Sequence, residues 1–209
     1  MKSYGYKKKQ KEQRKKEIIT AARKVFSTKG FNAATMEEIA LEAQLSPGAL
    51  YLYFKSKEDL HTLLSIEILK HLADKIREVD NKNFSVETKI EKFCDVFIEI
   101  YDYDSNILIN LFHLQSGETL QNLSTEVLQC LNENSILAHG AITDVMKKGT
   151  EEGIFIDEHP AALADILWAT YAGVILWVNS KRLLNNQKDF IKPTLNTAFK
   201  IINRGINRR

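Results

Sequence analysis

The sequence predicts an all-α protein. Of its 209 residues only three are proline and nine are glycine, and strand-like alternation of apolar and polar residues is scarce. Apolar residues instead recur at helical spacing nearly throughout the chain. With 44% hydrophobic and 27% charged residues, the chain has enough apolar material for a packed core. We expect a small N-terminal three-helix head followed by a larger helical body.

The head begins with two predicted helices. The first spans about 11–29, keeps its apolar residues on one stripe and ends at Gly30. The second begins at Thr35, which forms a capping box with Glu38 three residues later, and ends near residue 44. The glycine that ends the first helix and the cap that begins the second predict two separate helices here.

The third predicted helix is short and the remaining ones are long. Ser46 can cap the third helix with Pro47 at its first position, and this helix ends near Phe54. Ser56 caps a fourth helix that runs to about residue 79. Further helices are expected over 85–102, 105–115, 124–152, 160–183 and 188–204.

Charge is unevenly distributed along the chain. Residues 1–60 hold 13 Lys or Arg and 7 Asp or Glu, whereas residues 61–209 hold 16 and 20. Eleven of these 13 basic residues lie in the first thirty positions, and we expect residues 1–12 to form a flexible basic arm. Such an arm attracts a polyanion such as nucleic acid or an acidic membrane surface, although a merely solubilising tail has the same composition.

Several classes of function lack support in the sequence. Cys94 and Cys130 stand alone, without a second ligand at metal spacing, so we expect buried small residues and neither a metal site nor a cofactor. No secretory signal is visible, and the apolar stretch Ile166–Val178 is too short to span a bilayer. No catalytic motif is present. We therefore expect a cytoplasmic protein that is neither an enzyme nor membrane-bound.

Residues 35–54 have the pattern of a helix-turn-helix, in which two short helices are joined by a tight turn. Leu50 and Phe54 lie on one face and can pack inward, while Gly48 and Ala49 are small enough for the backbone to approach DNA. Periodicity alone leaves DNA binding open, because short helix pairs are common in α-proteins. The polar tips available for phosphate oxygens belong to Tyr51, Tyr53, Lys55 and Lys57.

A wider set of residues recurs at fixed spacing across the head: Ile18, Ala21, Ala22, Phe26, Gly30, Phe31, Ala34, Thr35, Met36, Ile39, Ala40, Ala43, Leu45, Ser46, Gly48, Leu50, Tyr51, Tyr53, Phe54, Lys57, Glu58 and Leu60. This set resembles the DNA-binding head of the TetR (tetracycline-repressor-like) family. The resemblance covers about residues 13–72 and leaves 73–209 as a helical ligand-binding and dimerisation body. It implies that Thr35 begins the second helix at the DNA, and that Lys57 clamps a phosphate. It further implies groove or phosphate contacts from Ser46, Pro47, Gly48, Ala49, Tyr51, Leu52 and Tyr53.

The last two predicted helices carry apolar faces suited to dimerisation. A single head has a short footprint, so proteins of this kind pair two heads on consecutive major grooves. In the resembled family the last two helices of each subunit build a four-helix interface. The alternative is that these faces close the core of one subunit. The expected interface residues are Leu167, Tyr171, Val174, Ile175, Val178, Leu195, Phe199 and Ile202.

Aromatic and histidine residues of the body suit a largely apolar pocket with a few polar groups. The resemblance implies a bacterial transcription repressor that a small, largely apolar effector releases from its double-stranded operator as the body changes conformation. The alternative function is a helical adaptor that no longer binds DNA. The expected pocket residues are His61, Phe97, Tyr101, Phe112, His113, Trp168 and Tyr171.

Overall fold

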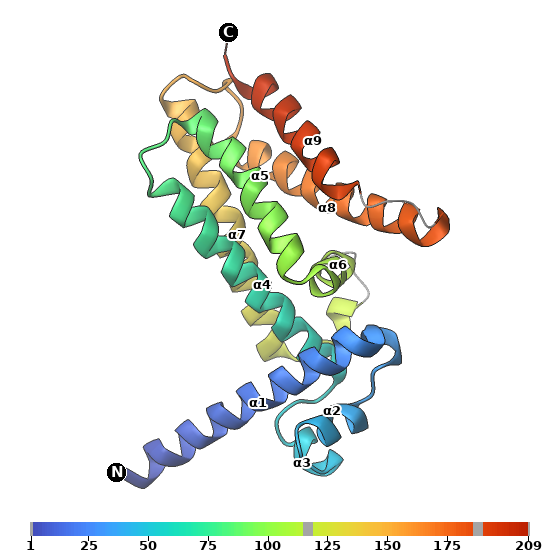
Figure 1. Cartoon of the computed structure of the whole chain (residues 1–209). Helices are drawn as coiled ribbons and strands as arrows, with labels where there is room; N and C mark the ends of the chain where they lie inside the picture. Colours follow the sequence, from blue (N-terminus) through green and yellow to red (C-terminus); the bar gives the residue numbers. More distant parts are fainter. Residues whose placement is uncertain (1, 115–118, 186–189, 209) are drawn as a thin grey trace. The chain divides into compact units, whose positions relative to one another are not determined.

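The computed structural model describes residues 2–114, 119–185 and 190–208, and it confirms the all-α fold class (Figure 1). The expected boundaries at 115 and 188 lie outside these residues. The helices are α1 (Lys2–Ala33), α2 (Met36–Glu42), α3 (Pro47–Tyr51), α4 (Lys57–Asp80), α5 (Val86–Tyr103), α6 (Ser105–Leu114), a 3-10 turn (Thr119–Asn122), α7 (Thr125–Glu151), α8 (Pro160–Asn185) and α9 (Ile191–Ile206).

The chain forms two compact units. Unit 1 consists of Met1–Ile66 and Leu114–Leu131, and unit 2 consists of Glu67–His113 and Asn132–Arg209. Helix α4 therefore contributes residues to both units, and the start of α7 joins the N-terminal head. This last feature is not apparent from chain order, because α7 begins 45 residues after α4 ends.

A small apolar core holds unit 1 together. Ile18 and Phe26 of α1, Ile39 of α2, Leu50 of α3 and Leu60 of α4 are all almost completely buried. Helix α1 packs on α2, and α2 packs on α3. The predicted inward faces of the first three helices are therefore the ones that fold against each other, because only those faces carry apolar side chains at helical spacing.

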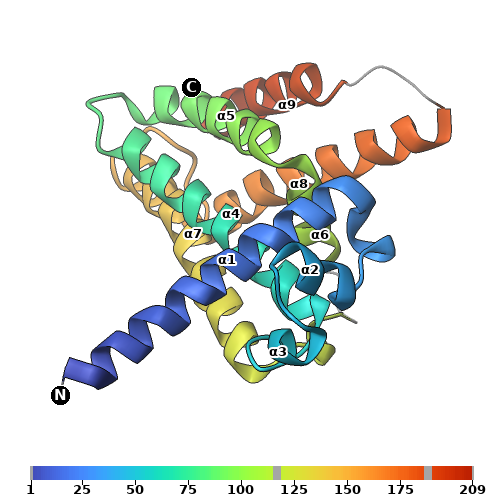
Figure 2. The ribbon, with the colours of Figure 1, turned by 60° about the horizontal axis from the view of Figure 1, so that its bottom comes forward.

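Helix α1 is longer than the sequence analysis expected. It begins at Lys2, so residues 2–12, expected as a flexible arm, continue the helix (Figure 2). Lys, Gln, Arg and Glu are good helix formers, and here their propensity extends a helix whose later turns are fixed by packing. The expected break at Gly30 is present, since this residue has φ 76° and leaves the helical conformation.

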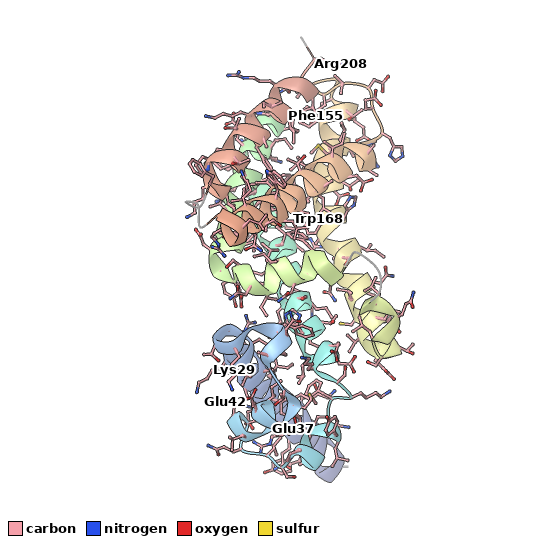
Figure 3. All side chains as sticks on the ribbon, turned by 90° about the vertical axis from the view of Figure 1, so that its right-hand side faces the viewer. Lys29, Glu37, Glu42, Phe155, Trp168 and Arg208 are labelled. Carbon is pink, nitrogen blue, oxygen red and sulfur yellow. The ribbon has the colours of Figure 1, made fainter. Side chains whose placement is uncertain are left out.

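A backbone strap fixes the end of α9 in unit 2. Phe155, between α7 and α8, forms an isolated antiparallel bridge with Asn207. The amide of Ile156 donates to the carbonyl of Ile206 at 2.7 Å, and the amide of Arg208 donates to Ile154 at 2.8 Å. Phe155 and Arg208 accordingly lie at the same end of unit 2 (Figure 3). The chain beyond α9 thereby anchors that helix.

An ion cluster joins α4, α5 and α7 within unit 2. The Asp80 carboxylate accepts hydrogen bonds from Lys89 Nζ at 2.8 Å and from Lys148 Nζ at 2.7 Å. Burial acts to raise the pKa of Asp80, but the bonds from Lys148 and Lys89 outweigh it, and the pKa lies below its usual value. Because Lys89 is buried, loss of its partner carboxylate would leave a charge without compensation.

Helix α8 is long and rich in apolar residues. Its stretch Pro160–Arg182 is long and apolar enough to cross a membrane by length and composition, with mean hydropathy 1.7. This stretch is longer than Ile166–Val178, the apolar stretch that is too short to span a bilayer. Core helices of soluble proteins pass the same test. One face of α8 is buried at helical spacing, at Ala164, Leu167 and Tyr171 among others, and α8 packs on α9.

Candidate nucleic-acid interface

Helix α2 begins with the predicted capping box. Thr35 Oγ1 accepts a hydrogen bond from the Glu38 amide, and Glu38 Oε2 accepts one from the Thr35 amide, both at 3.2 Å. These two bonds satisfy amides that would otherwise lack partners at the helix start. Thr35 itself remains exposed, which leaves its methyl group and one face of its hydroxyl open to solvent.

The turn between α2 and α3 is tight. Gln44 adopts a positive φ of 55°, a conformation that residues other than glycine seldom adopt, and the Leu45 amide donates to Ala40 at 2.8 Å. Ser46 then caps α3 by accepting from the Ala49 amide at 3.2 Å, with Pro47 at the first helical position. The turn and both caps are local, so the direction of α3 is set by the residues that the sequence analysis identified.

The expected DNA-contact residues gather on one exposed side of α3 and the segment after it. Leu50 and Phe54 are buried, as expected for the inward face. Leu52 is 80% exposed and Tyr51 is 49% exposed, although both have large apolar surfaces. A Cβ added to Gly48 would meet no other atom within 4 Å, so its small size has no internal packing role. Exposed residues are Thr35, Ser46, Pro47, Gly48, Tyr51, Leu52 and Lys55, with Ala49, Tyr53 and Lys57 half-buried.

Lys57 has a different role from the one the resemblance implied. Its ammonium donates to the backbone carbonyls of Phe31 at 3.0 Å, Asn32 at 3.3 Å and Ala34 at 3.1 Å. It also lies 4.8 Å from the centre of the Phe31 ring. An ammonium has three donors, and all three are used here. This geometry argues against the expected phosphate contact. Lys57 instead ties the start of α4 to the segment between α1 and α2, across more than twenty residues.

Two lysines of the N-terminal basic run are paired with α2. Lys24 Nζ lies 2.6 Å from Glu42 Oε1, and Lys29 Nζ lies 2.5 Å from Glu38 Oε1. Lys29 and Glu42 are labelled in Figure 3. The hydrogen bond from Lys29 lowers the pKa of Glu38, so the capping carboxylate is held in its charged form. These pairs offset the charges of Lys24 and Lys29 at the C-terminal end of α1. The other basic residues of α1 lie nearer its N-terminus.

The family model described as "Bacterial regulatory proteins, tetR family" matches residues 18–62. That match begins in the buried face of α1, spans α2 and α3, and ends in the first turns of α4. The head of this chain is of the TetR type. The chain is a DNA-binding transcriptional regulator with a helix-turn-helix at its N-terminal end, as the resemblance implied.

Similar proteins extend the likeness beyond the head. The uncharacterized HTH-type transcriptional regulator YhgD of Bacillus subtilis (strain 168) is 26% identical over 78% of this chain and 82% of its own. The fatty acid metabolism regulator protein of the same organism is 23% identical over 96% of this chain and 100% of its own. The structure of Bacillus subtilis FadR in complex with stearoyl-CoA matches with TM-score 0.67 and 21% identity, over 91% and 98% of the two chains. The solved structure has the same fold as this chain, and both it and YhgD are described as transcriptional regulators.

The expected effector residues do not all come together. His61 lies in unit 1, where its ring centre is 5.1 Å from that of Phe26 and 4.8 Å from that of Phe31. Burial lowers the pKa of His61 to about 4, so its imidazole is neutral near pH 7. His113 lies on α6, but its side chain is outside the part that the structure describes.

The other expected effector residues lie in unit 2, four of them as a ring cluster between α5, α6 and α8. Phe97 and Tyr171 stack at 4.2 Å, and the Phe112 ring centre lies 5.6 Å from those of Tyr171 and Trp168. The Tyr171 hydroxyl donates to the Phe97 carbonyl at 2.9 Å, and burial raises its pKa well above the usual value. Tyr101 is buried on the same helix as Phe97. The hydroxyl expected to face an effector is thus already bonded within the protein.

Most of the expected dimer residues are inside the subunit. A side chain buried in one chain has no surface left for a second chain, so the six buried residues close the core of the subunit instead. Val174 and Ile202 are half-buried at the edge of that core. The sequence could not show which side of α8 faces the core, because this helix is apolar on nearly every side. The six buried residues are Leu167, Tyr171, Ile175, Val178, Leu195 and Phe199.

The outer faces of α8 and α9 are apolar and exposed. On α8, Ile166 is 53% exposed and Trp177 is 64% exposed, with Ala169 and Gly173 between them at helical spacing. On α9, Ile201 is 66% exposed. An exposed apolar face of this kind marks a surface on which another protein can pack.

Proposed function

We propose that this chain represses transcription as a homodimer whose two α3 helices occupy successive major grooves of an operator. The observation that carries the proposal is the exposed side of the helix-turn-helix, where Gly48 lets the backbone approach and Tyr51 and Leu52 are held out from the core. Tyr51 offers a hydroxyl for phosphate, and Leu52 offers an apolar surface for a thymine methyl group.

DNA binding is tested by gel shift on the DNA upstream of the gene, at two salt concentrations. We expect tight binding, a steep fall in affinity with salt, and protection that is symmetric about a two-fold axis. Tyr51→Ala should weaken binding without unfolding the protein, since this side chain is half-exposed. Absence of binding in dilute buffer would favour the adaptor alternative.

We propose that the effector is a long-chain acyl thioester of coenzyme A. Support comes from the relatives, one described as a fatty acid metabolism regulator and another bound to stearoyl-CoA, and from the aromatic cluster of Phe97, Phe112, Trp168 and Tyr171 in unit 2. An acyl chain entering this cluster must separate rings that now pack together. Its binding is therefore coupled to movement of α5, α6 and α8, which is what an effector needs to shift a conformational equilibrium.

Stearoyl-CoA is compared with coenzyme A alone and with free stearate as competitors of operator binding. We expect release by the thioester only. A shift in tryptophan fluorescence should accompany it in a Trp177→Phe variant, which leaves Trp168 as the reporter. Release without any change in that fluorescence would locate the effector elsewhere, and no release by any of the three would contradict this effector class.

We propose that the dimer forms through the outer faces of α8 and α9. The supporting features are the exposed Ile166 and Trp177 with the small residues Ala169 and Gly173 between them, because small residues let two helices approach closely. Ile166→Glu should produce monomers in sedimentation experiments. Leu41→Glu, at a residue of α2 that is 79% exposed, is the matched control and should leave the dimer intact. A persistent dimer in Ile166→Glu would place the interface on another face.

A further inference from the structure

The N-terminal half of α1 borders a hollow that shares only Tyr53 with the expected helix-turn-helix contacts. The hollow measures about 530 Å³ and is open to solvent. It belongs entirely to unit 1, where α1 runs out beyond α2 and α3 (Figure 2). It is lined by Gln10, Lys11, Gln13, Arg14, Glu17 and Tyr53.

The lining is suited to an anion. Lys11 and Arg14 carry positive charge, and the two glutamines and Tyr53 each have a hydrogen-bond donor. Glu17 is the one lining residue that only accepts when ionised. Tyr53 lies two residues after the end of α3, so the hollow is continuous along the chain with the surface that carries Tyr51. An anion bound here would lie directly beside the proposed reading helix.

Glu17, itself a lining residue, forms an ion pair with Arg14 of this hollow. Arg14 donates to Glu17 Oε2 at 2.7 Å, and Gln13 donates to Glu17 Oε1 at 3.3 Å. The bond from Arg14, and then the bond from Gln13, lower the pKa of Glu17, so its carboxylate is charged at neutral pH. All of these groups are solvent-exposed, and an exposed pair of this kind exchanges partners at low cost.

We propose that this hollow seats a phosphate of the DNA backbone, and that Glu17 holds Arg14 until the phosphate replaces it. The inference rests on the proposed function, since it adds a flanking contact to the same operator complex. A phosphate offers Arg14 the same paired acceptor oxygens as a carboxylate. The volume exceeds that of a free phosphate and leaves room for the sugars of a passing strand. Helix α1 thereby extends the footprint outward from α3.

The decisive comparison uses two variants with the same change in net charge. Glu17→Gln frees Arg14, and we expect a several-fold higher affinity for the operator. Glu12→Gln is the matched control, because Glu12 lies on the same helix outside the hollow, with its carboxylate 3.8 Å from Lys15. We expect at most a small gain from Glu12→Gln. Equal gains from both variants would mean that only overall charge matters, and would overturn the proposal.

A second experiment locates the phosphate. Arg14→Gln should reduce the slope of log affinity against log salt by about 0.9, the value for one phosphate contact. Neutral methylphosphonates placed singly along the operator should weaken wild-type binding at one position per half-site that Arg14→Gln no longer senses. Glu17→Gln should add nothing in the Arg14→Gln background. An unchanged salt slope in Arg14→Gln, or the same methylphosphonate profile as the wild type, contradicts the proposal.

Different results contradict the proposed function and the phosphate site in the hollow. If the wild type does not bind duplex DNA, the proposed function fails. If the wild type binds and Tyr51→Ala weakens it while Arg14→Gln has no effect, only the hollow has been misassigned. Loss of binding to phosphatidylglycerol vesicles in Arg14→Gln, with operator binding intact, would assign the hollow to a lipid surface and overturn the DNA contact.

Discussion

Lys57→Met separates a structural lysine from a phosphate-binding one. The substitution keeps most of the length of the side chain and removes all three donors to the carbonyls of Phe31, Asn32 and Ala34. Water can replace the exposed bond to Asn32, whereas the bonds to Phe31 and Ala34 are partly buried. We therefore expect the segment between α1 and α2 to loosen, and with it the position of Thr35.

The expected loss follows from the two partly buried bonds. A bond from a charged donor contributes about 1.5–3 kcal/mol, and partial exposure places each of these at the lower end, so the total is about 3 kcal/mol. For a chain of this size, that loss lowers the unfolding temperature by about 6–12 °C. Thermal unfolding followed by circular dichroism measures it. Operator binding well below the transition should keep its salt slope.

Lys55→Met is the matched control for Lys57→Met. Lys55 is exposed and lies two residues earlier, so its removal should leave stability within about 0.5 kcal/mol and reduce the salt slope instead. An unchanged unfolding temperature in Lys57→Met, together with a salt slope lower by about 0.9, would refute the structural role and restore the phosphate contact that the resemblance implied.

Three further predictions concern stability. Gly149→Ala places a Cβ 2.1 Å from the buried ring of Phe155 and should lower the free energy of unfolding by about 1–3 kcal/mol in denaturant titrations, with partial recovery in the double variant with Phe155→Leu. Tyr171→Phe leaves the Phe97 carbonyl without its extra donor and should cost about 1 kcal/mol by the same method. The pKa of His61 is about 4 in the folded protein against 6.5 unfolded, so its contribution to stability is complete above pH 6.5 and is lost as the pH falls toward 4; this amounts to about 3 kcal/mol, and the decline it causes should vanish in His61→Leu. An equally steep decline in His61→Leu would place the acid sensitivity elsewhere.

The sequence predicted the features that depend on neighbouring residues. The capping box of Thr35 and Glu38 and the Ser46 cap with Pro47 each join residues three or fewer positions apart, so their pattern is visible without a fold. Most helix bounds followed from the same local signals, although α3 ends at Tyr51 and not near Phe54. The larger exception is α1, whose lysine-rich start suggests an arm by its charge, although the same residues are good helix formers and continue a helix fixed further along.

The features that depend on distant residues could not be predicted. The carbonyls around Lys57 come from residues 23 to 26 positions earlier, and no pattern signals that they converge on its ammonium. The side of α8 that faces the core could not be predicted either. Tyr171 and Trp177 are equally suited to a core by residue type, yet Tyr171 is buried and Trp177 is 64% exposed. Both outcomes are decided by tertiary packing.

Affinity cleavage from the turn before α3 tests the central claim most directly. Gly48 has to stay small for the backbone to approach the groove, so the chelate is attached at Gln44, which is exposed and is not an expected DNA contact. Gln44→Cys in a Cys130→Ser background can carry an iron chelate while Cys94 stays buried. The account predicts two clusters of strand cleavage with a major-groove offset, about one helical turn apart and related by a two-fold axis. Cleavage at one cluster only, or the same weak cleavage along the whole duplex, would contradict a dimer that places α3 in successive grooves.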